Sequence, residues 1–237
     1  MVLTTINSFS QTSQYTSQTT SWEPLNSYIA GGLVTGVAMI LKSRYGNIEI
    51  IPQIGPSTNW MRYDQELTNF YNTNNVTPGK LWGFSGGYLI GGRLGYEGKY
   101  VVRFGLSFDS KGRSYKSEYT EGYSRLNYIS IPMMIGIESD RDRDIITSVC
   151  VGPFISLPVG EKHIIKSNGI TSEFKPLQTL GPDAGLLTNL GIEYKINSDI
   201  SFNTDIRIMS GMIQTEKLAG KGFTQSAQIL FGIKVWL

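Results

Sequence analysis

Cysteine and histidine are almost missing from this chain of 237 residues, which contains one of each, Cys150 and His163. A single cysteine excludes an internal disulfide bond and any metal site built from several cysteines. With one histidine, a zinc site made of histidine and cysteine ligands is not expected either. The composition therefore gives no reason to expect a metal or another cofactor.

An excess of one charge sign is also missing, because 21 Lys and Arg residues face 19 Asp and Glu residues and the formal net charge is +2. A chain so evenly balanced gives no reason to expect nucleic acid or an acidic partner. Its length suits one β-barrel or one to two ordinary domains. Composition by itself therefore leaves the fold open.

The first 24 residues are expected to form a leader remnant and a flexible arm. Residues 2–11 resemble the end of a secretory leader, with small polar residues before a plausible cleavage point at Ser10 or Gln11, but without the basic and most of the apolar part of a leader. An ordinary disordered terminus is the alternative. Residues 12–24 are rich in Ser, Thr and Gln, which indicates a flexible arm.

Residues 25–44 favour one short helix. Ile29, Leu33, Val37 and Leu41 recur every four residues, and the alternation typical of a strand is lost. A membrane-spanning helix is the competing interpretation, but the uncharged run is only about as long as a marginal span. We expect a helix that lies against the main fold or against a partner.

The main fold is best seen in the stretch from Leu126 to Ile137, which reads LNYISIPMMIGI. Every second residue from Ile129 to Ile137 is large and apolar, while Ser130 and Pro132 fall on the other side. This alternation predicts a β-strand with one apolar face. Such a face must be buried against a second sheet or turned toward lipid.

Alternation and turn residues predict eight strands in residues 47–237. The expected strands cover 47–60, 82–96, 99–109, 122–138, 143–157, 182–196, 199–210 and 223–237. Their connections alternate between long ones, at 61–81, 110–121, 158–181 and 211–222, and short turns. An even number of antiparallel strands with this alternation is typical of a transmembrane β-barrel of the outer membrane, with short turns and both termini in the periplasm.

The second face of these strands collects charged side chains. Its charged residues are Glu49, Arg93, Arg103, Glu193, Asp205, Arg207 and Lys234. A water-soluble carrier of apolar ligands would turn its apolar face inward and its charges outward. Placing this many charges inside is favourable only when the exterior solvent is hydrocarbon. We therefore expect a barrel that spans a lipid bilayer.

Aromatic residues on the apolar face gather near the strand ends, as in the aromatic girdles of membrane barrels. Trp60, Trp82, Phe84, Phe108, Tyr123 and Phe223 fall beside the long loops. Tyr96, Tyr100, Tyr194 and Phe202 fall beside the short turns.

The interior of an eight-stranded barrel is only wide enough for its own side chains. Because the inward charges nearly balance, we expect them to form a salt-bridged, structural network and no open pore. A lipid-modifying hydrolase or acyltransferase is the main enzymatic alternative, which requires a histidine beside a serine nucleophile. His163 could serve only with Ser156, Ser167 or Ser172, and it is expected to be a solvated loop residue.

Residues 80–137 resemble the PorT-like family of outer-membrane β-barrels from Bacteroidota. The resemblance rests on Ser110-Lys111-Gly112 at the place of a family turn and on the strand LNYISIP at 126–132. Two later strands, VGPF at 151–154 and DAGL at 183–186, also resemble the family. The resemblance implies an eight-stranded outer-membrane barrel with no catalytic residues, and some members of the family act in type 9 secretion or gliding.

These observations together predict a non-enzymatic outer-membrane barrel that serves as a structural or accessory subunit of an envelope complex. Its expected partners are the lipid bilayer and other outer-membrane or periplasmic proteins, which would bind residues 12–44 or the long loops. A lipid-modifying enzyme and a small channel are the alternatives.

Overall fold

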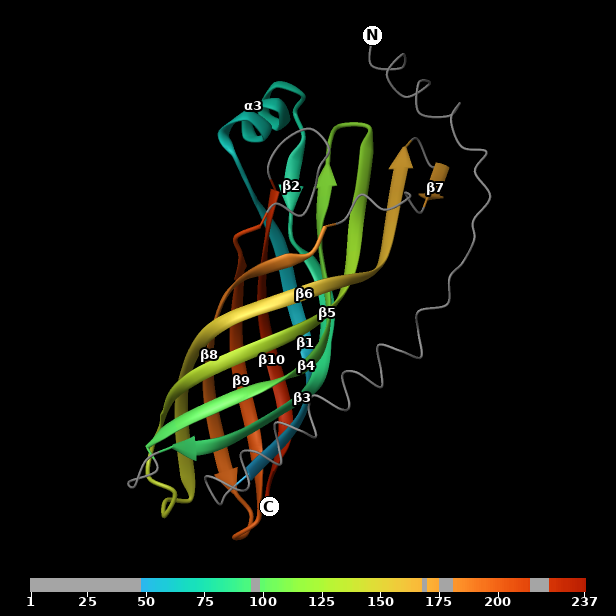
Figure 1. Cartoon of the computed structure of the whole chain (residues 1–237). Helices are drawn as coiled ribbons and strands as arrows, with labels where there is room; N and C mark the ends of the chain where they lie inside the picture. Colours follow the sequence, from blue (N-terminus) through green and yellow to red (C-terminus); the bar gives the residue numbers. More distant parts are fainter. Residues whose placement is uncertain (1–47, 95–98, 168–169, 175–180, 214–221) are drawn as a thin grey trace, which may run out of the picture. The chain divides into compact units, whose positions relative to one another are not determined.

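Long antiparallel strands dominate this computed structural model, which describes residues 48–94, 99–167, 170–174, 181–213 and 222–237. Eight strands of the described chain form one closed ring (Figure 1). These are β1 (Ile48–Tyr63), β3 (Leu81–Leu94), β4 (Tyr100–Lys116), β5 (Thr120–Glu138), β6 (Ile145–Ser167), β8 (Asp183–Lys195), β9 (Ile200–Gly211) and β10 (Gly222–Trp236).

The ring closes because its first and last strands pair with each other. β1 is antiparallel to β10, with Glu49 opposite Trp236 and Tyr63 opposite Gly222. The remaining strands pair with their neighbours in chain order, and the pairing of β4 with β5 completes the circle. The predicted eight-stranded antiparallel barrel is confirmed.

One end of the barrel, here called the short-turn end, holds the connections between β5 and β6 and between β8 and β9, together with the end of β3 and the start of β4. At the opposite end, β4, β5 and β6 continue past the ring and form a projecting sheet (Figure 1). Two short strands extend this sheet, since β2 (Thr77–Gly79) pairs with β4 and β7 (Ile170–Phe174) pairs with β6. The helix α3 (Gln65–Thr73) lies between β1 and β2.

The predicted connections at this projecting end were partly wrong. β4 and β5 stay paired from Ser107 opposite Ser130 to Lys116 opposite Glu121, so the expected long loop at 110–121 is only a tight turn. Ser110-Lys111-Gly112 is consequently strand and not the family-like turn. β6 likewise continues to Ser167, through the first part of the loop expected at 158–181.

The two faces of the strands are sorted as the alternation predicted. Ile131 and Ile206 on the outer face are 38% and 46% exposed, whereas Arg103 and Asp205 on the inner face are 1% and 0% exposed. Phe104 also lies on the outer parity, because Val101, Arg103 and Gly105 are the buried residues of β4. A wide apolar exterior around a charged interior suits a hydrocarbon solvent.

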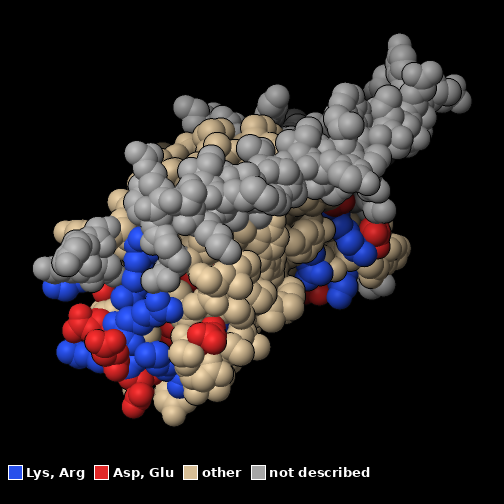
Figure 2. All heavy atoms as spheres, turned by 60° about the horizontal axis from the view of Figure 1, so that its bottom comes forward, with Lys and Arg blue, Asp and Glu red and all other residues tan. Residues whose placement is uncertain are grey.

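Charged and uncharged residues are also separated along the outer surface of the barrel. Figure 2 shows acidic and basic residues gathered toward two ends of the described surface, with a largely uncharged expanse between them. No helix in the described residues is long and apolar enough to cross a bilayer.

The described aromatic residues predicted for the two girdles lie on the outer face of the strands. Trp82, Phe84 and Phe108 are exposed toward the projecting end, and Trp60, Tyr123 and Phe223 there are half-buried. Tyr100, Tyr194 and Phe202 are exposed beside the short turns. Tyr96 lies outside the described residues, as do the expected leader remnant, arm and helix of residues 1–44.

Depth in the bilayer should control the cost of a charge on the outer face. Ile206→Arg, in the middle of β9, is expected to lower the free energy of unfolding by about 2–4 kcal/mol, because it puts a cation near the bilayer midplane. Ile200→Arg, on the same face of β9 beside a short turn, should cost at most about 1 kcal/mol. Guanidinium unfolding in liposomes measures both. Equal costs would contradict a membrane-spanning position.

Candidate functional site

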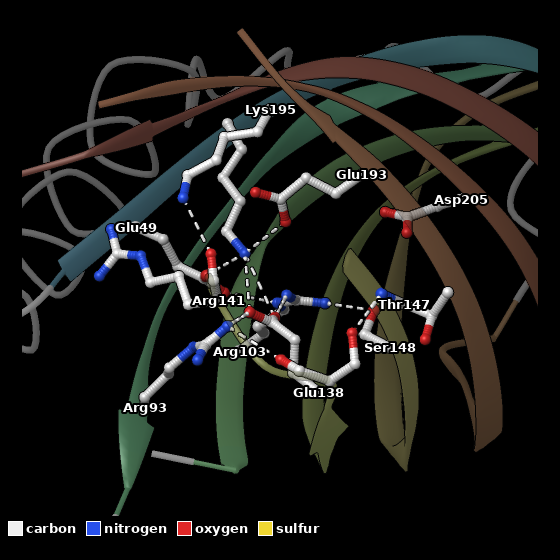
Figure 3. A network of polar contacts seen from close by, with 12 residues as sticks. Glu49, Arg93, Arg103, Glu138, Arg141, Thr147, Ser148, Glu193, Lys195 and Asp205 are labelled. Atoms are coloured by element: carbon white, nitrogen blue, oxygen red, sulfur yellow. Dashed lines mark hydrogen bonds and ion pairs between the residues drawn. The ribbon is translucent and has the colours of Figure 1, made fainter. Parts of the chain in front are cut away.

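Six charged side chains meet inside the barrel near the short-turn end (Figure 3). The three anions are Glu49, Glu138 and Glu193, and the three cations are Arg93, Arg103 and Lys234. We call these six residues the ionic plug. Their charges cancel, which is required where no water can stabilise an unpaired ion.

Arg103 and Lys234 hold the ionic plug together. The Arg103 guanidinium contacts Glu49 Oε1 at 2.5 Å and Glu138 Oε2 at 2.6 Å. Lys234 Nζ lies 2.6 Å from Glu49 Oε2, 2.8 Å from Glu193 Oε2 and 3.2 Å from Glu138 Oε2. Arg93 pairs with Glu138 from the side of the short turns. Each anion therefore contacts at least one cation from another strand.

Gly91 of β3 has no side chain, and the ionic plug occupies the space beside it. A Cβ atom on Gly91 would lie 2.7 Å from Arg103 Cγ and 2.8 Å from Glu49 Oε1. Larger residues at this position would collide with both partners. The glycine-rich stretch at 86–92 of β3 thus provides room for the inward charges, as small residues do where side chains crowd.

The indole of Trp236 covers the ionic plug at the short-turn end. Its ring lies 3.5 Å from Arg141 Cζ and 4.0 Å from Lys234 Nζ. Such stacking of cations on an aromatic face is attractive. Burial lowers the pKa of Arg141, which belongs to the turn between β5 and β6.

A second group of polar residues fills the middle of the barrel. Arg207 donates to Gln53 Oε1 at 2.5 Å, and Gln53 donates to Asp205 Oδ2 at 2.8 Å. Asn189 donates to Asp205 Oδ1 at 2.9 Å and accepts from Arg207 at 3.4 Å. The two ions are therefore joined through the Gln53 and Asn189 amides.

A third group lies closer to the projecting sheet. Lys111 Nζ is 2.8 Å from Asp183 Oδ2, and Thr224 also donates to this oxygen. The ammonium stands 4.6 Å from the ring centre of Phe154. Apolar side chains fill the space between the polar groups: Ile51, Leu89, Val101, Met134, Cys150, Phe154, Leu187 and Met209 form a buried cluster. Ions and apolar groups together occupy the interior.

The sequence pattern identified most of the inward charges but missed Asp109, Lys111 and Glu138. Asp109, which accepts a hydrogen bond from Gln228 at 3.0 Å, is the last residue of the expected strand 99–109. The structure places Glu49, Arg93, Arg103, Glu193 and Lys234 in the ionic plug, and Asp205 and Arg207 in the middle group. Glu138 was missed, although its parity with Met134 in the expected strand 122–138 could have identified it. Lys111 was missed because its segment was assigned to a loop.

A different polar group occupies the inner face of the projecting sheet. Ser124 Oγ lies 2.8 Å from His163 Nδ1, and Glu161 Oε1 contacts His163 Nε2. Next to them, Arg113 donates to Tyr71 Oη at 3.1 Å and to Tyr63 Oη at 3.4 Å. Burial raises the pKa of the neighbouring Tyr115 phenol above its ordinary value.

His163 is therefore not the solvated loop residue that the sequence suggested. It belongs to β6, its side chain is 18% exposed, and both ring nitrogens contact polar partners. Its serine partner is Ser124 of β5, which was not among the three serines considered. The pairing was hidden because both segments had been placed at or beyond the ends of their strands.

No group of three or more His, Cys, Asp and Glu side chains within the described residues could hold a metal ion.

The fold and the filled interior define a class of protein. A closed antiparallel barrel with an apolar outer face and a charged, packed inner face is a transmembrane β-barrel of the outer-membrane type.

Comparisons with solved structures give distant matches. No family model and no curated protein matches the chain. Among solved structures, Ail, the attachment invasion locus protein of Yersinia pestis, is 13% identical with a TM-score of 0.37, covering 80% of this chain and 98% of Ail. Neisserial surface protein A is 14% identical, with a TM-score of 0.42 and coverage of 78% and 96%. The outer membrane protein OprG from Pseudomonas aeruginosa is 12% identical, with a TM-score of 0.44 and coverage of 80% and 95%.

Removing one partner of the Lys111–Asp183 pair should cost more than removing both charges. Lys111→Met leaves the Asp183 carboxylate buried without its cation and is expected to lower the free energy of unfolding by about 3–5 kcal/mol. Adding Asp183→Asn should restore part of this loss, because no buried charge remains unpaired. Guanidinium unfolding of the wild type, both single variants and the double variant gives the four free energies of unfolding of a double-mutant cycle. A double variant as unstable as the sum of the single variants would exclude the coupling.

Proposed function

We propose that this protein is a sealed, non-conducting barrel of the bacterial outer membrane that serves as a structural or accessory subunit of an envelope complex. The observation that supports this function is the ionic plug, which fills the interior with neutralised charges and leaves them almost fully buried. A pore requires water along its axis, and charges lining such a pore would be hydrated. The plug therefore favours an anchor over the small channel.

The same proposal orients the barrel. Short turns of outer-membrane barrels face the periplasm and the longer segments face outside. By this rule the short-turn end, with the start of β1 and the end of β10, is periplasmic, and the projecting sheet stands outside the cell. Lipid contacts the apolar outer face between the aromatic residues.

The assignment of a family and of a particular envelope complex rests on the sequence resemblance described above. The strand motif at 126–132 supports membership of the PorT-like family, and through it a place in a type 9 secretion or gliding complex. Envelope proteins would bind residues 12–44 or the projecting end. The charges of the ionic plug take part in no catalysis under this proposal.

The native Cys150 reports whether the interior is sealed. It is the only cysteine of the chain and is 1% exposed, with Sγ 3.8 Å from the Arg103 guanidinium. A water-soluble maleimide should not modify it in the folded protein and should modify it fully in denaturant. The control is Cys150→Ser with Asp140→Cys, whose thiol sits in an exposed turn and should react at once. Fast labelling of folded Cys150 would contradict a sealed barrel.

Conductance and co-purification test the two halves of the function. The wild-type chain in planar bilayers should give no current steps under conditions in which an inserted porin does. Extraction from its own membrane with mild detergent should retain stoichiometric envelope proteins. Current steps would support the channel, and a monomer without companions would refute the accessory role.

A further inference from the structure

The inner face of the projecting sheet carries polar side chains that the sealed barrel does not need for stability in lipid. The strand register places Arg113 of β4 opposite Ser124 of β5, and Ser124 opposite His163 of β6. These three residues therefore form one row across the sheet. Glu161 lies two residues before His163 on β6, on the same face.

A one-residue bulge makes this row possible. On the barrel part of β6, even-numbered residues such as Phe154 and Ser156 are buried in the interior. The register with β5 then shifts, since Tyr128 is opposite Pro158 whereas Asn127 is opposite Gly160. The extra residue, Val159, reverses the parity, so that Glu161 and His163 also face inward. Bulges commonly re-aim side chains in this manner at barrel rims and active sites.

The hydrogen bonds give each member of the group a distinct role. An ionised carboxylate only accepts hydrogen bonds, so contact with Glu161 places the ring proton on His163 Nε2. His163 Nδ1 is then an acceptor, and the Ser124 hydroxyl donates to it across 2.8 Å. This is the order carboxylate, imidazole, hydroxyl that activates a serine nucleophile. The two ring nitrogens have exchanged places relative to the usual serine triad, but either nitrogen can act as the base.

We propose that Ser124, His163 and Glu161 form a hydrolytic site for small, water-soluble carboxylic esters, with Ser124 as nucleophile and His163 as general base. Glu161 is a positioning residue that holds the imidazole. The Arg113 guanidinium, in the same row, stabilises the negative charge that develops on the substrate oxygen. This activity goes beyond the proposed accessory function and does not depend on it.

The reaction needs only water as a second reactant. Ser124 Oγ attacks the ester carbonyl carbon while its proton passes to His163 Nδ1, and the carbonyl π electrons move to oxygen. Collapse of this intermediate breaks the bond to the alkoxide, which leaves as the alcohol with the proton from Nδ1. Water, deprotonated by Nδ1, then attacks the acyl-serine, and a second collapse releases the carboxylic acid and restores the Ser124 hydroxyl.

The surroundings favour a small polar substrate over a bilayer lipid. The site faces the barrel axis and not the apolar exterior, and Arg113, Tyr63 and Tyr71 lie beside it. Ser124 itself is 2% exposed. Shielding of the nucleophile from bulk water is compatible with catalysis, because it strengthens electrostatic interactions within the site.

Covalent labelling of the wild-type full-length protein in detergent tests the site directly. A fluorophosphonate probe phosphonylates activated serines, and peptide mass spectrometry identifies the modified residue. The expected result is modification at Ser124, with slow hydrolysis of p-nitrophenyl acetate that the probe abolishes. Modification elsewhere, or none, overturns the proposal without requiring any variant to fold. The maleimide and conductance results, which test the sealed barrel, are independent of this outcome.

Variants then assign the roles. Ser124→Ala should abolish labelling, whereas Ser130→Ala, on the same face of β5 but paired with Ser156, should leave it unchanged. His163→Gln should slow labelling by about 100-fold or more, as expected for loss of a general base. Heat-dependent migration in SDS gels checks that each variant is folded. Labelling of Ser124 that survives His163→Gln would show that the histidine is only structural.

Glu161→Gln needs a readout that distinguishes positioning from folding. Without the carboxylate, the imidazole is no longer held against the Ser124 hydroxyl, so the kcat for p-nitrophenyl acetate should fall while KM stays the same. Glu161→Asp keeps a carboxylate and should restore part of the rate. An unchanged kcat in Glu161→Gln would exclude Glu161 from the site.

Discussion

Hydrocarbon cannot hydrogen-bond, so every polar group at membrane depth must find its partner within the protein. The closure of β1 against β10 and of β4 against β5 satisfies the backbone of all eight barrel strands. The same constraint acts on the side chains. Each charge that the alternation directs inward meets an opposite charge or an amide, and this requirement explains the ionic plug, the amide-bridged ions and the Lys111–Asp183 pair.

The buried ions also specify the register. A slip of one residue in any strand would turn its apolar side chains inward and its charges toward lipid. In the ionic plug, Arg103 and Lys234 each join carboxylates from two or more other strands. Such a slip would break several ion pairs together, so the plug stabilises one arrangement of strands against its alternatives.

The barrel and the projecting sheet divide the protein into a part governed by lipid and a part governed by water. Inside the membrane, the inner face is neutral and filled, which suits an anchor. Beyond it, the bulge in β6 brings Glu161 and His163 to the inner face, beside Ser124. The proposed hydrolytic site lies in this second part, because its chemistry needs water.

Alternation determined the outward orientation of residues such as Ile131 and Ile206, because a period of two directly encodes which face meets which solvent. Together with turn residues and the order of long and short connections, it also predicted the strand number and the barrel. It also named the inward residues Arg103, Glu193 and Lys234. It could not find where β4 and β6 end, since polar strands that leave the membrane lose the apolar alternation and resemble loops. The Ser124–His163 pair depends on strand register and on a bulge, which are set by contacts between strands, and only the tertiary structure decided them.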